Sequence, residues 1–266
     1  MQAYKAKKSL GQNFLKSKPA LRKIIEAGEI RKDDVILEIG PGKGKLTSKL
    51  LEKSNCVIAV EKDRELFEFL KTKFEKEIKN RKLILIEDDC LNFNPKDYNL
   101  KPGTYKLISN IPYNITGAIL KKFLTDNNQP ERMVLLLQQE VAQRIVARNP
   151  RYGGAGGKES ILSISVKAYG EPKMIMKVPA RYFSPAPKVD SAVIAIKNIS
   201  RKNFVNSPEF EEKFWEIVKT GFAHKRKKLS GNLKNLISFE NPNFSKFKDA
   251  RAEDLSLEDW ITLAKN

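Results

Sequence analysis

Histidine and cysteine are almost absent from this sequence. The 266 residues contain one histidine and two cysteines, fewer than the ligands that a zinc site built on these residue types requires. A Ser-His-Asp triad would have to use His224, which lies in the basic stretch "GFAHKRKKLS" with no serine-nucleophile motif around it. We therefore interpret His224 as part of a basic, solvated surface and expect no metal site.

Long apolar runs are missing as well. None approaches the roughly 20 residues of a membrane span, and the basic start "MQAYKAKKSLGQNFLK" lacks the apolar stretch of a signal peptide. Cys56 and Cys90 each lie in or beside a strand-like run, which favours buried thiols in a reducing compartment over a disulfide. We expect a cytoplasmic protein that does not bind a membrane. Apolar residues still make up 41% of the chain, enough for a core.

Acidic residues are outnumbered, and the basic ones are clustered. The chain has 50 Lys and Arg against 32 Asp and Glu, a net charge of +18. Residues 1–20 contain five lysines and no acid, and residues 217–234 contain six basic residues and no acid. Clustered charge of one sign is expected of a protein that neutralises phosphates. A nucleic-acid partner is favoured over the alternative, a merely soluble basic or heat-adapted surface.

Short apolar runs alternate with longer amphipathic ones. The runs at 35–40, 56–61, 83–88, 105–110 and 133–138 have the length and near-continuous apolar character of strands covered on both faces. Between them "LTSKLLEK", "RELFEFLKTKFEKE" and "TGAILKKFLTD" have helical spacing. This alternation predicts an open α/β sheet of the Rossmann-like, mostly parallel kind. "ILSISVKAYG" and "SAVIAIKNI" follow each other without a clear helix between them, which predicts antiparallel strands at one edge.

The character of the chain changes after about residue 199. The segment "SPEFEEKFWEIVKTGFAHKRKKLSGNLKNLI" is helical in period, with Ser207 as a cap and Pro208 in the first turn, and "LSLEDWITLAKN" predicts a closing helix. We predict an α/β domain at 1–198 and a small all-α domain at 199–266.

A glycine-rich turn follows the first predicted strand. In "EIGPGKGKLT" the glycines at 40, 42 and 44 have G-x-G-x-G spacing, whereas a dinucleotide fingerprint would place its third glycine at position 45, where this chain has Lys45. A phosphate-binding G-x-x-x-x-G-K-[ST] loop is absent from this turn. What remains is a tight turn at a helix start, where a ligand can approach the backbone closely.

Polar groups end the next three strands. Glu61 lies at the end of the second strand, where a carboxylate can accept hydrogen bonds from both ribose hydroxyls of a nucleoside. Asp88 and Asp89 follow the third strand, and one of them can accept from an adenine amine; Asn110 ends the fourth. The carboxyl edge of an open α/β sheet is where ligands bind. Together these residues predict a nucleoside-bearing cofactor, and the missing third glycine favours S-adenosylmethionine, which has no pyrophosphate, over NAD.

These motifs carry a family resemblance. "QNFL", "EIGPGKGKLT", "VEKD", "DDCLNF", "NIPYNIT", "QQEVAQRI" and "RYFSPAPKVDSAVI" occur in this order over residues 12–194, and "GFAHKRKKLSGNL" follows. The chain resembles the rRNA adenine N6,N6-dimethyltransferases, the kasugamycin-sensitivity family, which is related to the macrolide-resistance rRNA methyltransferases. The resemblance implies a class I methyltransferase domain, S-adenosylmethionine as cofactor, and dimethylation of two adjacent adenosines in a hairpin near the 3′ end of 16S rRNA within the immature small ribosomal subunit.

The resemblance also implies roles for individual residues. Glu61 would hold the ribose, Asp89 the adenine, and Asn110 would lie where cofactor and target base meet. Phe183 would form an aromatic wall for the base, with Tyr182 as the second choice. Cys90 stands where relatives usually have alanine, and we expect no effect on activity. The full set of implied cofactor contacts is Asn13, Leu15, Gly40, Gly42, Glu61, Asp89 and Asn110.

The "NIPY" stretch fits methylation of a weak nucleophile, since the lone pair of adenine N6 is delocalised into the ring. The side-chain oxygen of Asn110 and the backbone carbonyl of Ile111 can each accept one N6–H, and Pro112 helps to fix where that carbonyl points. Tyr113 supplies a ring on which an extruded base can stack. Catalysis would come from positioning and hydrogen bonds, without a strong general base.

Two other functions stay open from the residues. A macrolide-resistance type enzyme would methylate one adenosine of large-subunit (23S) rRNA; "NIPY" in place of "NLPY" leans toward it, whereas "PKVDSAVI" and the basic C-terminal helices lean toward the small-subunit enzyme. A non-catalytic RNA-binding assembly factor would keep the fold without needing methylation. In each case the exposed basic run Lys225, Arg226, Lys227 and Lys228 is expected to contact RNA.

Overall fold

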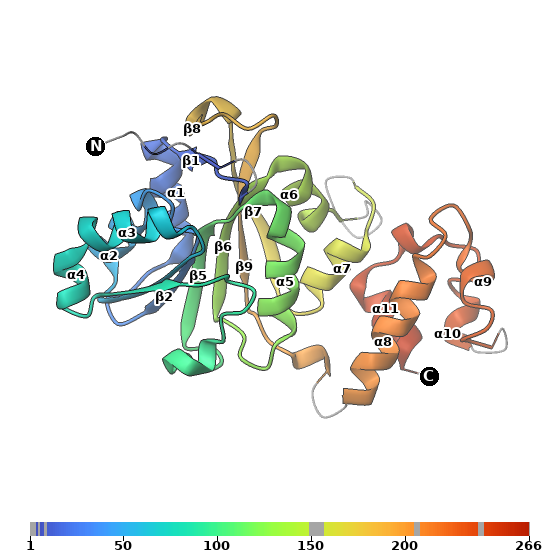
Figure 1. Ribbon diagram of the computed structural model, residues 1–266. Coiled ribbons are helices and arrows are strands. Elements are labelled where there is room, and N and C mark those ends of the chain that lie inside the picture. Colours follow the sequence, from blue (N-terminus) through green and yellow to red (C-terminus); the bar gives the residue numbers. More distant parts are fainter. Residues whose placement is uncertain are drawn as a thin grey trace. The chain divides into compact units, whose positions relative to one another are not determined.

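The computed structural model describes Tyr4 and residues 6–7, 10–148, 157–204, 208–238 and 242–265 (Figure 1). The chain divides into two compact units. The first unit comprises residues 1–142 and 171–199, and the second comprises residues 143–170 and 200–266.

A seven-stranded sheet with the order β4-β3-β2-β5-β6-β9-β7 is the centre of the first unit (Figure 1). Its strands are β2 (Val35–Ile39), β3 (Cys56–Glu61), β4 (Leu83–Glu87), β5 (Tyr105–Asn110), β6 (Arg132–Gln138), β7 (Glu171–Val178) and β9 (Ser191–Lys197). The strands from β4 to β6 pair in parallel, and β9 pairs antiparallel with both β6 and β7. The predicted α/β sheet, mostly parallel with an antiparallel edge, is confirmed.

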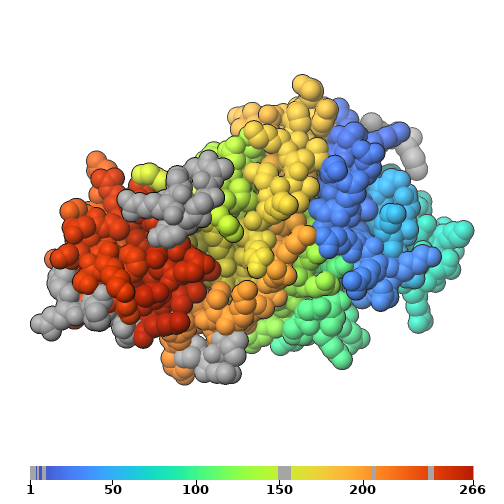
Figure 2. Space-filling view, turned by 180° about the vertical axis from the view of Figure 1, so that it is seen from behind, coloured from blue at the N-terminus to red at the C-terminus, as the bar shows by residue number. Residues whose placement is uncertain are grey.

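Helices cover one face of this sheet with a continuous apolar core. Ile24, Leu50 and Leu70, one from each of three helices, are fully buried in one cluster with alternate strand residues such as Val57 and Val134. These helices are α1 (Lys18–Gly28), α2 (Lys45–Lys53) and α3 (Arg64–Lys73), and the short α4 (Glu75–Lys79) follows α3. The N-terminal segment with α1 (blue) lies beside the segment with β7 (yellow) in Figure 2, and α1 packs against β6 and β7.

The remaining elements of the first unit are short, except for one helix. Strand residues that alternate with the cluster, such as Leu37, Leu107 and Leu135, are also fully buried, so both faces of the sheet are covered. α5 (Thr116–Thr125) follows β5, and several of its own side chains, including Ile119 and Phe123, are buried. The short elements are η2 (Pro95–Tyr98), η3 (Tyr113–Ile115), η5 (Ala180–Tyr182), β1 (Phe14–Leu15) and β8 (Phe183–Ser184), and β1 and β8 pair antiparallel.

The register of the parallel strands gathers their carboxyl ends at one edge. Ile39 of β2 lies opposite Val60 of β3, and Glu61 lies opposite Glu87 of β4. β2 is flanked by β3 on one side and by β5 on the other, so the strand order reverses at β2. A crevice opens at such a reversal because the connections leave in opposite directions.

One predicted strand is wrong. The run "ILSISVKAYG" forms α7 (Ile161–Lys167), and the edge strand that pairs with β9 is β7 instead. A capping box explains the helix: the side chain of Ser160 accepts from the backbone N–H of Ser163 at 3.1 Å, and the hydroxyl of Ser163 accepts from the backbone N–H of Ser160 at 2.7 Å. This reciprocal pair satisfies two N–H groups at the helix start, and it outweighs the β-branched residues that suggested a strand.

The second unit is helical in the part that the structure describes. Its elements besides α7 are η6 (Lys202–Phe204), α8 (Pro208–Gly221), α9 (Leu229–Asn232), α10 (Pro242–Ser245), η7 (Ala252–Asp254) and α11 (Leu257–Ala264). α8 and α11 approach closely at Gly221, where an added Cβ would meet the ring of Trp260 at 2.4 Å. The Trp260 ring is fully buried and also packs against Phe222, with ring centroids 5.5 Å apart. The predicted helices at 208 and at the C-terminal end are confirmed, whereas the Ser207 cap lies outside the described residues.

The unit boundaries differ from the predicted domain boundary in one segment. Residues 143–170 belong to the second unit, together with residues 200–266. α6 (Gln139–Val146) contains the first of these boundaries. The assignment of functions to 1–198 and 199–266 stays a prediction. Within the described ranges, no helix is long and apolar enough to cross a membrane.

Candidate active site

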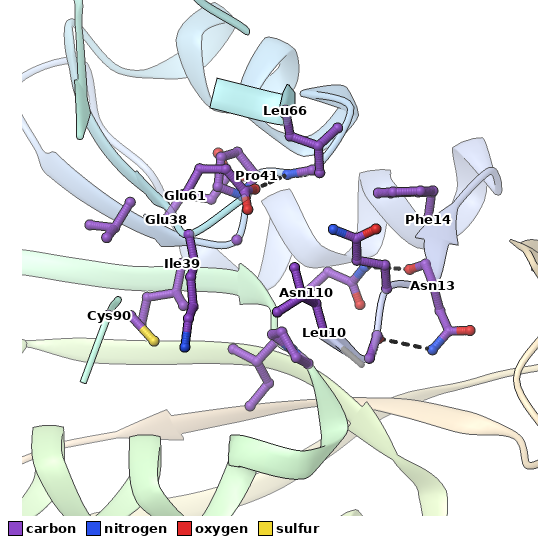
Figure 3. Close-up of a pocket in the computed structure, with 18 of the residues that line it drawn as sticks. Leu10, Asn13, Phe14, Glu38, Ile39, Pro41, Glu61, Leu66, Cys90 and Asn110 are labelled. Carbon is purple, nitrogen blue, oxygen red and sulfur yellow. Dashed lines mark hydrogen bonds between the residues drawn. The ribbon is translucent and has the colours of Figure 1, made fainter. Parts of the chain in front are cut away.

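A cavity of about 190 Å³ lies at the carboxyl edge of the sheet in the first unit (Figure 3). Its lining comes mainly from the N-terminal segment 10–15, the end of β2 with the glycine turn after it, the ends of β3 and β4, and the turn after β5. Leu21 of α1 and Leu66 of α3 also contribute. All the cofactor residues predicted from the sequence line it, namely Asn13, Leu15, Gly40, Gly42, Glu61, Asp89 and Asn110. The sheet register therefore brings these residues together, while their individual roles stay predictions.

Two glycines of the glycine turn have little room for a side chain. Gly42 and Gly44 have φ angles of 58° and 70°, in the left-handed region that favours glycine. An added Cβ on Gly42 would meet the Phe14 ring at 3.0 Å, and one on Gly44 would meet Phe74 at 2.5 Å. Backbone thus lines this side of the cavity at the start of α2. A ligand can approach such a backbone more closely than it could approach side chains.

Glu61 is held by backbone donors on both carboxylate oxygens. The backbone N–H of Gly42 donates to Oε2 at 3.0 Å (Figure 3). The backbone N–H of Asp63 donates to Oε1, also at 3.0 Å. Burial raises the pKa of Glu61, and these backbone donors oppose that rise. The carboxylate is therefore fixed in orientation at the mouth of the glycine turn, and each oxygen retains a lone pair for a hydroxyl.

A second glutamate lines the cavity and was not predicted as a site residue. Glu38 of β2 is 1% exposed, and its Oε2 has no hydrogen-bond partner among the described residues. Burial raises its pKa to about 8, and the nearby negative charge of Glu61 adds to this effect. The available sign in the sequence was a charged residue in the middle of the apolar run "VILEIG". An orphaned buried carboxyl oxygen in a cavity wall is suited to form a hydrogen bond with a bound molecule.

Asp89 is paired with a lysine that was also not predicted. The ammonium of Lys62 lies 2.7 Å from Oδ2 of Asp89, and the backbone N–H of Leu91 donates to Oδ1 at 2.9 Å. The pKa of Asp89 is lowered, chiefly by Lys62. Both Lys62 and Cys90 line the cavity, and burial raises the pKa of the Cys90 thiol to about 12. Asp89 is therefore an ionised acceptor, and Cys90 is an unreactive thiol beside it.

The N-terminal segment is tied down at a position next to Glu61. The hydroxyl of Tyr4 and the side-chain amide of Gln12 donate to Oδ2 of Asp63 at 2.7 and 3.0 Å. The ammonium of Lys7 lies 3.0 Å from the same carboxylate. Asp63 is also the N-cap of α3, accepting from two backbone N–H groups. This cluster fixes the chain that leads into residues 10–15 of the cavity wall.

Asn110 connects the N-terminal segment to the turn after β5. Its side-chain Nδ2 donates to the backbone carbonyl of Asn13 at 3.2 Å, while the side chain of Asn13 donates to the carbonyl of Gly11 at 3.1 Å (Figure 3). Because the amide nitrogen of Asn110 is engaged in this way, its Oδ1 is the end left to accept from a substrate. The structure thus determines which way this amide is turned.

The rest of the "NIPY" turn lines the same cavity. Asn110 ends β5, Pro112 has φ −58° and ψ 133°, and Tyr113 begins the 3₁₀ turn η3, after which α5 starts at Thr116. Ile111 is 1% exposed, and it lines the cavity together with Pro112 and Tyr113. Burial raises the pKa of Tyr113, so its phenol is protonated and can donate a hydrogen bond.

Phe183, the predicted aromatic wall for the base, is not part of the lining of the described cavity. It is 2% exposed, pairs with Leu15 across the β1–β8 ladder and belongs to the apolar cluster under α1. A stacking role for Phe183 stays a prediction, and it would require the ring to become exposed. Tyr182 is half-buried, with the Arg181 guanidinium 5.5 Å from its ring centroid.

The basic run of the second unit is exposed. Lys225, Arg226, Lys227 and Lys228 all lie on the surface of that unit, in the turn between α8 and α9. Lys228 is paired with Asp249 at 2.9 Å. A contact between this run and RNA stays a prediction. Among the described residues, no group of three or more His, Cys, Asp or Glu is arranged to hold a metal ion.

The chain is similar to proteins of known name. A family model described as "Ribosomal RNA adenine dimethylase" matches residues 3–266. "Ribosomal RNA small subunit methyltransferase A" of Dehalococcoides mccartyi (strain CBDB1) is 36% identical over 266 residues, covering 97% of this chain and 87% of that protein. Among solved structures, a dimethyladenosine transferase from Plasmodium falciparum has a TM-score of 0.76 at 24% identity, covering 94% of this chain and 95% of its own. The 23S rRNA methyltransferase ErmE has a TM-score of 0.74 at 25% identity, covering 95% and 98%.

Proposed function

The chain belongs to the ribosomal RNA adenine dimethylase family, and we propose that it transfers methyl groups to N6 of two adjacent adenosines in a hairpin near the 3′ end of 16S rRNA. The product would be N6,N6-dimethyladenosine, made during biogenesis of the small ribosomal subunit. The resemblance predicted from the motifs is confirmed by this membership. The family implies S-adenosylmethionine as the methyl donor and ribosomal RNA as the substrate.

The cavity fits a nucleoside-bearing methyl donor. S-adenosylmethionine supplies an electrophilic methyl on a sulfonium, with a ribose and an adenine at one end and an amino acid at the other. In our proposal the side-chain-free turn at Gly40 and Gly42 admits it, Glu61 accepts from the ribose hydroxyls, and Asp89 accepts from the adenine amine. Asn13 and Leu15 line the methionine end. Oε2 of Glu38 has no partner among the described residues, which supports this fit, since a hydrogen bond with a polar group of the ligand would satisfy it.

The "NIPY" turn would hold the target base. Oδ1 of Asn110 and the carbonyl of Ile111 each accept one N6–H, which turns the nitrogen lone pair toward the methyl. Pro112 fixes the direction of that carbonyl, and the Tyr113 ring stacks on the flipped adenine. Stacking of this kind contributes about 1–3 kcal/mol per base. The acceleration comes from holding the two reactants in line, with preorganised acceptors and no strong base.

One observation supports this proposal most strongly: the cofactor cavity and the "NIPY" turn share a wall at Asn110. The hydrogen bond from Asn110 Nδ2 to the carbonyl of Asn13 keeps the opposite end of the amide available. A side chain that only capped a strand would not need a fixed amide orientation inside a cavity.

Replacing Asn110 tests the mechanism. Asn110→Ala should abolish methyl transfer to immature small subunits while leaving RNA affinity within about twofold, because one acceptor is lost and no basic residue is changed. Asn127→Ala, at an exposed asparagine after α5, is the matched control and should behave like the wild type. Wild-type levels of dimethyladenosine in the Asn110 variant would refute the assigned role.

The second unit would supply RNA contacts. The exposed run Lys225–Lys228 carries four positive charges, and we propose that it neutralises rRNA phosphates. We also propose that the substrate is the immature small subunit in the cytoplasm. In this proposal the first unit, which contains the cavity, is the methyltransferase part, and the helical second unit is the RNA-binding part.

A macrolide-resistance type activity is the second candidate, because ErmE shares the fold over nearly the whole chain. Methyl transfer to immature small subunits and to naked 23S rRNA should be assayed side by side. Activity on 23S rRNA alone would favour the second candidate. Binding to small subunits without any transfer would favour a non-catalytic assembly factor.

A further inference from the structure

The hydroxyl of Tyr113 makes a hydrogen bond that links the "NIPY" turn to a distant part of the chain. Its oxygen lies 2.6 Å from Oγ of Ser191, 78 positions further along. Ser191 is fully buried, and it is the serine of the "PKVDS" stretch. Neither the sequence motifs nor the lining of the cavity assigns a function to it.

Ser191 is held in place from both sides. It is the first residue of β9, and because β9 runs antiparallel to β6, that first residue lies at the edge where β6 ends. It pairs with Gln138 of β6 and with Val178 of β7. The preceding Asp190 is also fixed: its carbonyl accepts from Gln139 N–H and its Oδ1 accepts from Ala180 N–H, each at 2.9 Å. Oγ of Ser191 is therefore a rigid point beside the site.

Tyr113 is fixed at its other end by the turn that contains it. Its carbonyl accepts from the hydroxyl of Thr116 at 3.1 Å, and Pro112 restricts the backbone before it. Its side chain is half-buried and lines the cavity. The hydroxyl is thus bonded into the sheet while the residue borders the space where a base would enter.

We propose that Ser191 is a positioning residue that holds the Tyr113 ring at the angle needed to stack on the flipped adenine. This rests on the proposed function, in which Tyr113 stacks on the base. Without the Ser191 hydroxyl the ring keeps its place in the turn but samples other side-chain angles, so fewer encounters place N6 in line with the methyl. The bond acts on the ring and not on the binding of RNA phosphates.

A double-mutant cycle tests this positioning. Ser191→Ala and Tyr113→Phe each remove one hydroxyl of the pair, and a hydrogen bond of ordinary strength predicts that each lowers kcat about 3- to 10-fold with KM for rRNA unchanged within twofold. Because both changes break the same bond, the double variant should be no slower than the slower single variant. A double variant whose kcat falls by the product of the two single-variant factors, or wild-type kcat in Ser191→Ala, would overturn the proposal.

A second buried serine serves as a control that separates an effect on the position of the Tyr113 ring from an effect on protein stability. Ser54 is 1% exposed and donates to the carbonyl of Asp34 at 2.6 Å, before β3 begins. The Ser54 hydroxyl also bonds to the backbone of Cys56, so Ser54→Ala should lower the melting temperature at least as much as Ser191→Ala does, but leave kcat unchanged. If Ser54→Ala lowers kcat to the same extent, the effect at Ser191 is one of stability and the positioning role is refuted.

A fluorescence readout works without methyl transfer. With 2-aminopurine at the target position of the rRNA hairpin, stacking on Tyr113 should quench the emission of the bound, flipped base, and Ser191→Ala should leave it brighter at the same bound fraction. Equal quenching in both proteins would contradict the proposal. Tyr113→Ala separates the positioning role of Ser191 from the stacking role of Tyr113. If Tyr113→Ala loses methyl transfer while Ser191→Ala keeps the wild-type rate, only the positioning role is refuted. If Tyr113→Ala is fully active, the proposed stacking itself is refuted.

Discussion

The buried carboxyl of Glu38 should make the stability of the free protein fall as pH rises. In the unfolded chain this glutamate loses its proton near pH 4.5, whereas in the folded protein burial raises its pKa to about 8. Between these two values the unfolded state binds fewer protons than the folded state, so the free energy of unfolding decreases with pH. The gap corresponds to about 5 kcal/mol at most, and relaxation around the site is expected to reduce it to about 2–4 kcal/mol.

Glu38→Gln removes this titration while keeping the size of the side chain. Urea unfolding at pH 5 and at pH 8.5 should show the variant gaining about 2–4 kcal/mol relative to the wild type over that interval, because only the wild type must ionise a buried group. Other titrating groups contribute equally to both proteins and cancel in the comparison. Glu68→Gln, at an exposed position of α3, should show no such gain. Identical pH slopes for the wild type and Glu38→Gln would refute the assignment of a neutral buried acid.

Two further predictions concern the glycine turn and the basic run. Gly44→Ala should destabilise the protein by more than about 2 kcal/mol in thermal melting, because φ is 70° and the new Cβ would meet Phe74 at 2.5 Å. Gly117→Ala is the control: it has open space around it and should not lower the melting temperature. Charge reversal across Lys225–Lys228 should weaken rRNA binding and reduce the slope of log K against log salt by up to about 0.9 per lost phosphate contact. Reversal of the exposed Lys71, Lys76 and Lys79 is the control, and equal changes of slope per reversed charge in the two sets would remove the basic run from the interface.

Much of the fold could be predicted because its signals are local. Each predicted strand of the parallel sheet is a continuous apolar run, and burial on both faces requires such a run. The glycine turn was equally visible, since positive φ angles at Gly42 and Gly44 demand residues without a side chain. The polar strand ends at Glu61, Asp89 and Asn110 follow from the parallel pairing alone, because it brings all carboxyl ends to one edge.

The misassigned element shows where local signals conflict. Residues 161–167 alternate serine with β-branched and apolar residues, so the run fits a strand and a helix equally well. The capping box between Ser160 and Ser163 settles it as a helix. Its place in the second unit depends on contacts between residues far apart in the sequence, which the periodicity of the run does not reveal.

The site residues that were missed depend on contacts between distant parts of the chain. Ser191 reaches Tyr113 only because β9 runs antiparallel to β6. Lys62 meets Asp89 only because β3 and β4 are neighbours in register. Glu38 gave a visible sign, a charge inside an apolar run, but its significance appears only when the cavity beside it is seen.

The most direct measurement is mass spectrometry of rRNA from cells that lack this protein and then receive it back. We expect N6,N6-dimethyladenosine at two adjacent positions near the 3′ end of 16S rRNA with the wild-type chain, and unmodified adenosines there with Asn110→Ala. Modification confined to 23S rRNA, or unchanged 16S modification in the Asn110 variant, would contradict the proposed function.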